Sequence, residues 1–207
     1  MSVKRKYIMQ VTKIAPDFTV PAVSAKGEII KNFNLYDNIE GRYAVLFFYP
    51  LDFTFVCPTE MIALHKRMDA FKSRNTEIIT VSIDSEFSHK HWRNTPIAEG
   101  GIGHVGYTMA ADIRHNICKD YGVEHPQEGV ALRASIIIDP KKQIRVSMVN
   151  DLPVGRNIDE LVRLVDALQF ADNHGEVCPA GWQQGKAAFE PNSEGISSFL
   201  EEHAEEL

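Results

Sequence analysis

One stretch of the sequence constrains the fold more than any other, the unbroken apolar run Tyr43-Ala-Val-Leu-Phe-Phe-Tyr49. Because this run is rich in β-branched and aromatic residues and has no polar alternation, it predicts a strand that is buried on both faces. Pro50 ends the run, and a short loop over 51–56 leads to Cys57-Pro58. Helical spacing of apolar residues then continues over 59–74. A doubly buried strand that leads into a helix is typical of sheets covered by helices.

The rest of the chain alternates between strand-like and helix-like periods. Further strands are predicted over 77–83 and, as two hairpins, over 18–20 with 29–33 and over 134–138 with 143–149. Further helices are predicted over 85–94, 112–121 and 157–171. This alternation predicts an α/β fold with a mixed sheet. The pattern breaks after Asp172, so we expect residues 1–172 to form one domain and residues 173–207 to form a C-terminal arm.

Composition and charge exclude several classes of function. The 207 residues include 22 Lys and Arg against 28 Asp and Glu, which gives a net charge of −6. Glutamates over 194–206 supply most of that excess, and the sequence has no basic surface of the kind that binds nucleic acid. The longest apolar run is far shorter than the roughly 20 residues of a membrane span. The N-terminus lacks the unbroken apolar stretch of a secretory signal, so we expect a cytoplasmic protein.

Cys57 stands at the junction of the buried strand, the loop and the helix start. Pro58 suits the first helical position, which makes Cys57 the predicted N-cap, with its sulfur facing the backbone N–H groups of Thr59 and Glu60. The positive end of a helix favours a thiolate over a thiol. Cysteine is also a common small core residue, and the residues around Cys57 leave both interpretations open.

A thiolate alone does not make a fast catalyst. When a thiolate attacks a peroxide, negative charge builds on the departing oxygen, and positioned donors are needed to stabilise it. Thr54 lies three residues before Cys57 and can place a hydroxyl beside the sulfur. Pro50 can shield the site from water and fix the loop. Arg133, just before the strand predicted over 134–138, is the candidate for a positive charge.

Several linked motifs resemble one family. The segment Pro50-Leu-Asp-Phe-Thr-Phe-Val-Cys57 matches the signature Pro-x-x-x-Thr-x-x-Cys of the peroxiredoxins, and Pro58-Thr-Glu60 follows it. The segment Gly175-Glu-Val-Cys-Pro-Ala-Gly-Trp182 is similar to the resolving-cysteine segment of the typical two-cysteine class, which includes the bacterial alkyl hydroperoxide reductase C subunits. Residues 91–96 and 150–156 also resemble family segments, so the likeness extends from about residue 14 to 191.

The resemblance implies a thioredoxin-like fold, with a central mixed sheet flanked by helices and a C-terminal extension that carries the resolving cysteine. It implies a thiol peroxidase that reduces hydrogen peroxide and organic hydroperoxides to water and alcohols. Cys57 would be oxidised to a sulfenic acid, and Cys178 of a partner subunit would condense with it into an intersubunit disulfide. By the same resemblance, Pro50, Thr54 and Arg133 shape the peroxide pocket. Glu60 and Arg156 would hold Arg133 and the loop.

The same resemblance implies partners but no cofactor or metal. A thioredoxin-type or flavoprotein reductase would restore both thiols, and the chain would form an antiparallel homodimer that assembles further into a decamer. The alternative function is a redox-regulated holdase chaperone, and peroxide-dependent consumption of reductant would separate the two. The segment around Cys178 contains Gly175 and Gly181 and few apolar anchors, as suits an arm that reaches a partner subunit. Because a disulfide needs Cα atoms within about 7 Å, we expect the Cys57 helix start to loosen during the reaction.

The remaining cysteine and the histidines have less specific patterns. Cys118 lies on a predicted helix, where a half-buried packing residue and a regulatory thiol are both possible. His89 and His91 are two residues apart and so do not share a helix face, which favours packing or surface roles over metal binding. The loop 100–103 resembles that of peroxiredoxins sensitive to overoxidation, but Phe199-Leu200 replaces their C-terminal Tyr-Phe pair. We therefore expect intermediate sensitivity.

Overall fold

The structure is a computed structural model that describes residues 10–207. Residues 4–9, part of the N-terminal stretch in which no secretory signal is expected, lie outside the described residues. The chain separates into two compact units, which divide between Ile158 and Asp159. The sequence placed this boundary at residue 172, after the last long helix rather than before it. By compactness that helix belongs with the C-terminal arm. Docking of the arm on a partner subunit stays a prediction.

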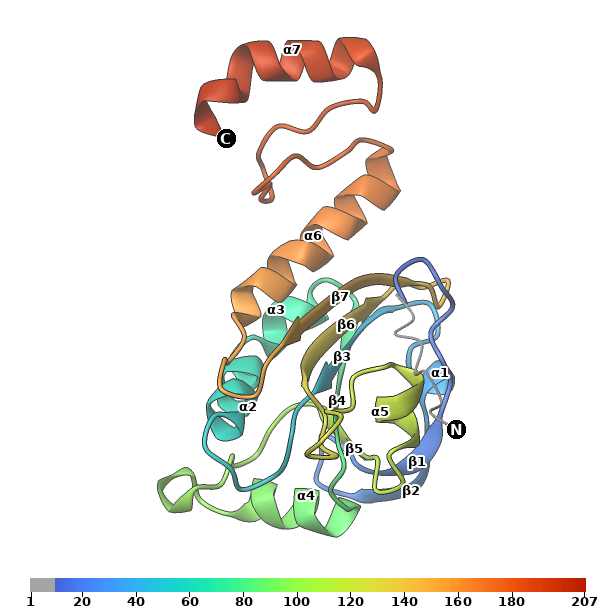
Figure 1. Ribbon diagram of the computed structural model, residues 1–207, viewed down its shortest axis with the longest axis vertical. Helices are drawn as coiled ribbons and strands as arrows, with labels where there is room; N and C mark the ends of the chain where they lie inside the picture. Colours follow the sequence, from blue (N-terminus) through green and yellow to red (C-terminus); the bar gives the residue numbers. More distant parts are fainter. Residues whose placement is uncertain (1–9) are drawn as a thin grey trace. The chain divides into compact units, whose positions relative to one another are not determined.

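A mixed sheet of seven strands organises the first unit, in the order β2-β1-β5-β4-β3-β6-β7 (Figure 1). The strands are β1 Thr19–Val23, β2 Ile29–Asn34, β3 Tyr43–Phe48, β4 Thr76–Ser82, β5 Thr108–Ala111, β6 Arg133–Ile138 and β7 Ile144–Asn150. The pairs β3–β4 and β4–β5 are parallel, whereas the other neighbours are antiparallel. All residues of β3 are buried, which confirms the doubly buried strand.

Helices and short turns connect and cover these strands. They are α1 Leu35–Asn38, α2 Cys57–His65, α3 Met68–Lys72, α4 Glu86–Asn94, η1 Ile97–Glu99, α5 Asn116–Asp120, α6 Ile158–His174, α7 Ser193–His203 and η2 Ala204–Glu206. Helix α3 packs on β4, and α4 packs against β1 and β5. The predicted α/β class and both predicted hairpins are confirmed.

Three details of the prediction are wrong. The single helix expected over 59–74 is two helices, α2 and α3, because the backbone of Arg67 leaves the helical region with φ −105° and ψ 6°. The helix expected over 112–121 begins only at Asn116, because His115 has a left-handed backbone with φ 58°. Strand β5 was missed; it is only four residues long and pairs in parallel with β4.

The core of the first unit lies on the sheet. Alternate residues of β3, among them Leu46 and Phe48, join one large apolar cluster with side chains of β6 such as Ala134 and Ile136. The intervening residues of β3 are equally buried, since that strand has neighbours in the sheet on both sides and cover on both faces. Within the described residues, no helix is long and apolar enough to span a membrane.

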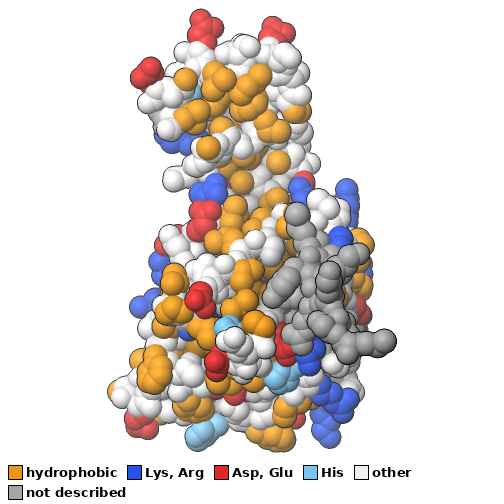
Figure 2. All heavy atoms as spheres, in the orientation of Figure 1, with side chains coloured by type: hydrophobic (Ala, Val, Ile, Leu, Met, Phe, Trp, Pro, Cys, Tyr) orange, Lys and Arg blue, Asp and Glu red, His pale blue; other side chains and the backbone are white. Residues whose placement is uncertain are grey.

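The second unit contains α6, a loop that carries Cys178, and the C-terminal helix α7. Asn192 caps α7 by accepting a hydrogen bond from the backbone N–H of Gly195. Acidic side chains stand out from this helix, at the top of the space-filling view (Figure 2). They belong to the glutamates that supply most of the negative charge of the chain. Phe199 is buried in the unit and Leu200 is exposed, but the sensitivity to overoxidation that this pair predicts stays a prediction.

Candidate active site

Strand β3 ends at Phe48, and Pro50 and the loop 51–56 lead from it to α2, whose first residue is Cys57. The predicted N-cap role of Cys57 is wrong, because Val56 is the N-cap and its carbonyl accepts the backbone N–H groups of Thr59 and Glu60. Those donors are therefore spent within the helix and do not face the sulfur. The Cys57 residue is buried, at 0% exposure.

A guanidinium lies directly beside this sulfur. Nη1 of Arg133 donates a hydrogen bond to Sγ of Cys57 over 3.4 Å. The same nitrogen donates to Oε2 of Glu60 at 2.8 Å, and Nε of Arg133 donates to the carbonyl of Leu152 at 2.6 Å. Arg133 is the first residue of β6, and antiparallel pairing places β6 beside β3. The sheet thus delivers the positive charge, and two further bonds fix its direction.

A second arginine completes the cluster. Arg156 donates from its backbone N–H and from Nε to Oε1 of Glu60, both at 2.8 Å, and from Nη2 to Oε2 at 3.0 Å. Its Nη1 donates to the carbonyl of Ala134 at 2.6 Å, and its guanidinium lies 3.3 Å from the ring centre of Phe47. Glu60 therefore joins both arginines, as the resemblance implied. The carboxylate of Glu60 is the shared partner of Arg133 and Arg156.

Burial and charge act in opposite directions on this cluster. Burial alone raises the pKa of the Glu60 carboxyl, but the hydrogen bonds and charge of Arg156, with the charge of Arg133, outweigh it, and the pKa is lowered. Burial lowers the pKa of Arg156 although Glu60 opposes that change. Two guanidinium groups facing one carboxylate leave one positive charge in excess among buried side chains. A buried excess charge is costly unless an anion balances it.

The lowered pKa of Glu60 predicts a specific acid sensitivity. Its contribution to stability is fully present above the ordinary value of 4.5 and is lost as the pH falls through the lower pKa of the folded state. Glu60→Gln leaves both guanidinium groups without a carboxylate, so we expect it to lower the free energy of unfolding at pH 7 by about 3 kcal/mol or more. That difference from the wild type should shrink below pH 4.5. Denaturant unfolding at a series of pH values measures this difference, and a difference that stays constant down to pH 3 would contradict the proposed charge on Glu60.

Of the two loop residues of the motif, Pro50 fits the expectation and Thr54 does not. The hydroxyl of Thr54 donates to the carbonyl of Leu51 at 2.9 Å, so its proton is directed along the loop and not at the sulfur of Cys57. Pro50 is buried at the end of β3, which suits the expected shielding role. Thr54 stiffens the loop in this state of the protein. The expected contact between its hydroxyl and the sulfur is not among its hydrogen bonds.

A buried polar cluster that the sequence did not predict anchors the start of the loop. Asp52 accepts hydrogen bonds from the hydroxyl groups of Tyr49 and Ser88, both at 2.7 Å, and lies 2.9 Å from Nδ1 of His89. Burial lowers the pKa of His89, but the hydrogen bond and charge of Asp52 outweigh it, so the pKa is raised. His89 is thus more than a packing residue, since it ties α4 to the loop.

Asp52, His89 and Asp84 also have the spacing of a metal site. One ligand atom from each lies within 4.8 Å of the others, and this is the one group of three such side chains found among the described residues. Their oxygen and nitrogen atoms are satisfied by one another and by neighbours, including the Ser82 hydroxyl and the carbonyl of Ala110. Hydrogen bonding alone therefore explains the geometry. The expectation of no metal and no cofactor stays a prediction.

The other two cysteines differ sharply in environment. Cys118 is fully buried in α5, and burial first, then the charge and hydrogen bond of Asp112, raises its pKa far above the ordinary value. This favours the packing interpretation of Cys118. Cys178 is partly buried in the second unit, and its thiol donates to the carbonyl of Ala167 at 3.5 Å. All three cysteines are free thiols in this structure.

Comparison with known proteins identifies the family of this chain. Residues 11–147 match the AhpC/TSA family. The chain is a peroxiredoxin. Residues 167–202 of this peroxiredoxin match the C-terminal domain of 1-Cys peroxiredoxin, a range that here includes Cys178. The match to the first family covers β1 to most of β7 and therefore the whole Cys57 cluster apart from Arg156.

Full-length relatives support the two-cysteine class. The peroxiredoxin is 49% identical to alkyl hydroperoxide reductase C of Buchnera aphidicola subsp. Schizaphis graminum, over 93% of its own chain and 98% of that relative. It is 52% identical to peroxiredoxin-1 of Gallus gallus, over 91% of its own chain and 94% of that relative. The crystal structure of reduced 2-Cys peroxiredoxin from Plasmodium vivax has a TM-score of 0.90 at 43% identity, and the match covers 94% of this chain and 100% of that one.

These findings confirm the predicted thioredoxin-like fold and the enzyme class. The protein is a thiol peroxidase of the typical two-cysteine type. These relatives are named alkyl hydroperoxide reductase C and peroxiredoxin-1, and they give no support to the holdase alternative.

Proposed function

We propose that this peroxiredoxin reduces hydrogen peroxide and small organic hydroperoxides with Cys57 as the peroxidatic nucleophile and Cys178 of a partner subunit as the resolving thiol. One observation carries the proposal: the guanidinium of Arg133 lies 3.4 Å from the sulfur of Cys57, in a cluster that Glu60 and Arg156 hold in place. A sulfur that served only to fill the core would not need a buried cation beside it.

The charge of this cluster favours an anionic sulfur. Arg133 and Arg156 share the single carboxylate of Glu60, and a thiolate at Cys57 would balance the remaining positive charge. The start of α2 adds a favourable field, since Cys57 is its first residue. The hydrogen bond from Arg133 can persist through the reaction, because it stabilises the thiolate first and the negative charge on oxygen next.

The reaction follows from this placement. The thiolate attacks one peroxide oxygen, an S–O bond forms as the O–O bond breaks, and the departing oxygen takes a proton and leaves as water or an alcohol. Arg133 is placed to stabilise the charge that grows on the oxygens. Cys57 is left as a sulfenic acid. Attack by the Cys178 thiolate then forms an S–S bond and breaks the S–O bond, and the departing hydroxide takes up the proton that the Cys178 thiol has released and leaves as water.

Formation of the disulfide requires motion around Cys57. Its residue is fully buried, and a disulfide needs the two Cα atoms within about 7 Å. We expect the loop 51–56 and the first turn of α2 to loosen after oxidation. The contacts of Asp52 with His89 and Tyr49 anchor the start of that loop, and they set the point from which it can open.

Partners and assembly form the less specific part of the proposal. A thioredoxin-type or flavoprotein reductase would return the disulfide to two thiols, and the subunits would form dimers that assemble into a decamer. Exposed aromatic side chains in the loop and in α4 support an interface there: Phe55 is 94% exposed and Phe87 is 67% exposed. A cytoplasmic location is the expectation from the sequence and stays a prediction.

Cys178→Ser separates the two steps of the cycle. We expect this variant to consume about one peroxide per subunit and then stall, because Cys57 is oxidised but finds no resolving thiol. The measurement is peroxide consumption with and without a dithiol reductase, followed by a non-reducing gel. The wild type should give a covalent dimer and the variant should not. Sustained turnover of Cys178→Ser with the reductase and no added small thiol would contradict the proposed role.

A further inference from the structure

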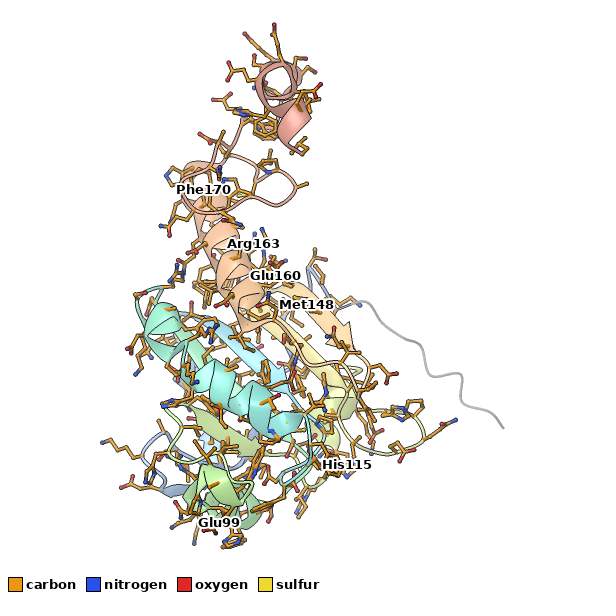
Figure 3. The ribbon with its side chains drawn as sticks, turned by 90° about the vertical axis from the view of Figure 1, so that its left-hand side faces the viewer. Glu99, His115, Met148, Glu160, Arg163 and Phe170 are labelled. Carbon is orange, nitrogen blue, oxygen red and sulfur yellow. The ribbon has the colours of Figure 1, made fainter. Side chains whose placement is uncertain are left out.

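The face of α6 that carries the arm has an ordered set of side chains. Glu160, Arg163, Ala167 and Phe170 are spaced three, four and three residues apart, so they lie along one face of the helix. Figure 3 shows Glu160, Arg163 and Phe170 following one another along α6. Each of the four makes a contact within the second unit, and together they form a seat for the segment 178–182.

Arg163 is the central contact of this seat. Its Nε and Nη2 donate to the two carboxylate oxygens of Glu160 at 2.6 and 2.7 Å, a fork-to-fork pair that fixes the plane of the guanidinium. Its Nη1 donates to the backbone carbonyl of Trp182 at 2.7 Å. Glu160 thus aims Arg163, and Arg163 holds the arm. Bidentate geometry is beyond the reach of a lysine at this position.

Cys178 lies on the same segment of the arm, four residues before Trp182. Trp182 is 2% exposed, with its ring centre 4.9 Å from that of Phe170 and its Nε1 donating to the carbonyl of Lys186 at 3.1 Å. The Cys178 thiol contacts the carbonyl of Ala167 on the same helix face, in a long hydrogen bond. The sulfur therefore rests on α6 through a weak contact, while Arg163 and Trp182 provide the firm one.

Charges around Cys178 give Arg163 a second effect. Burial raises the pKa of the Cys178 thiol and the neighbouring Glu176 raises it further, whereas the positive charge of Arg163 on α6 lowers it. The raised pKa is the net result, so at rest the sulfur is a thiol. Ala167, which faces it from α6, contributes only a neutral carbonyl. Arg163 is the group that favours the thiolate, the form that attacks.

We propose that Arg163, aimed by Glu160, is the positioning residue of the resolving step: it seats the arm through the Trp182 carbonyl and supplies the positive charge that assists Cys178. The inference rests on the proposed role of Cys178. In that step the Cys178 thiolate attacks the sulfur of the Cys57 sulfenic acid, the S–S bond forms, the S–O bond breaks and the hydroxyl leaves with a proton as water. In this step Arg163 contacts neither the departing oxygen nor the sulfur of Cys57.

The test compares Arg163→Gln with Arg163→Lys. Stopped-flow mixing with hydrogen peroxide would record the oxidation of Cys57 and the later formation of the disulfide across pH 5–9. For Arg163→Gln we expect disulfide formation about tenfold slower near neutral pH, with its pH profile displaced to higher pH. Arg163→Lys keeps the charge and loses the fork, so the profile should return to its wild-type position while the rate recovers only in part. The oxidation rate of Cys57 serves as the internal reference.

Controls keep the outcome decisive. Arg42→Gln removes an exposed arginine from its 3.0 Å ion pair with Glu77 and should change neither rate nor profile. Slower resolution should also raise the fraction of Cys57 found as sulfinic acid after a peroxide pulse in Arg163→Gln. If the disulfide forms in both variants at the wild-type rate and with the wild-type profile, Arg163 has no such role. If the wild type itself forms no disulfide with Cys178, the proposed function fails instead.

Discussion

Replacing Cys57 with serine is expected to lower peroxide turnover by about 10⁴-fold or more, because a serine hydroxyl beside Arg133 remains protonated and is a far weaker nucleophile toward peroxide. The fold should tolerate the change, since oxygen is smaller than sulfur and the Arg133 donor at 3.4 Å gives the hydroxyl a partner. Peroxide consumption in the presence of excess dithiol reductant measures the effect.

Cys118→Ala is the matched control for that experiment. Cys118 is equally buried, but its charged neighbours are the carboxylates of Asp112 and Glu124. Burial first, and then these carboxylates, raise the pKa of its thiol. We expect turnover within about twofold of the wild type and a modest loss of stability from the lost sulfur contacts. Turnover of Cys57→Ser within tenfold of the wild type would place the reactive sulfur elsewhere.

Arg133→Met is expected to slow the oxidation of Cys57 by about 10²–10³-fold, the usual cost of losing a positioned donor to a developing oxyanion. Methionine has a similar length, so the space beside Cys57 stays filled while the charge is lost. The remaining pair of Glu60 and Arg156 is balanced, with three hydrogen bonds between them. We therefore expect the variant to fold. Stopped-flow measurement of the second-order rate constant with hydrogen peroxide records the effect.

Two companions sharpen the comparison. Arg145→Met removes an arginine from an ion pair with Asp139 at 3.2 Å on β7 and should leave the oxidation rate unchanged. Arg133→Lys keeps the charge but not the fork that serves Cys57, Glu60 and the Leu152 carbonyl together, so its rate should lie between those of the wild type and Arg133→Met. An Arg133→Met variant that reacts as fast as Arg145→Met would show that the guanidinium is not part of the chemistry.

The parts of the fold that could be predicted are those that carry a strong local pattern. The run over 43–49 marked β3 because every side chain of that strand is buried, and the two hairpins followed from strand patterns joined by turns. The break between α2 and α3 was hidden, because Leu64 and Met68 continue the helical spacing across Arg67. Strand β5 is too short to show a period, and it is a strand only because β4 pairs with it.

The site shows the same division. The motif singled out Cys57, the need for a positive charge pointed to Arg133 before the strand over 134–138, and the resemblance added Glu60. The structure brings these three side chains into contact. Local backbone geometry was not predictable. The expected N-cap of α2 was Cys57, but the backbone makes Val56 the N-cap. The pair of Asp52 and His89 joins segments 37 residues apart, and no local sequence pattern predicts such a contact. The seat of Cys178 on α6 likewise depends on tertiary packing of the arm.

We expect the sulfur of Cys57 to be the first atom oxidised by peroxide. The most direct test adds one equivalent of hydrogen peroxide to the reduced protein, alkylates the remaining thiols within a second and maps the peptides without reduction. We expect Cys57 to be found linked to Cys178, with a covalent dimer on the gel, while Cys118 is recovered as an unoxidised thiol. Recovery of Cys57 as an alkylated thiol, with the oxidation on another residue, would contradict it.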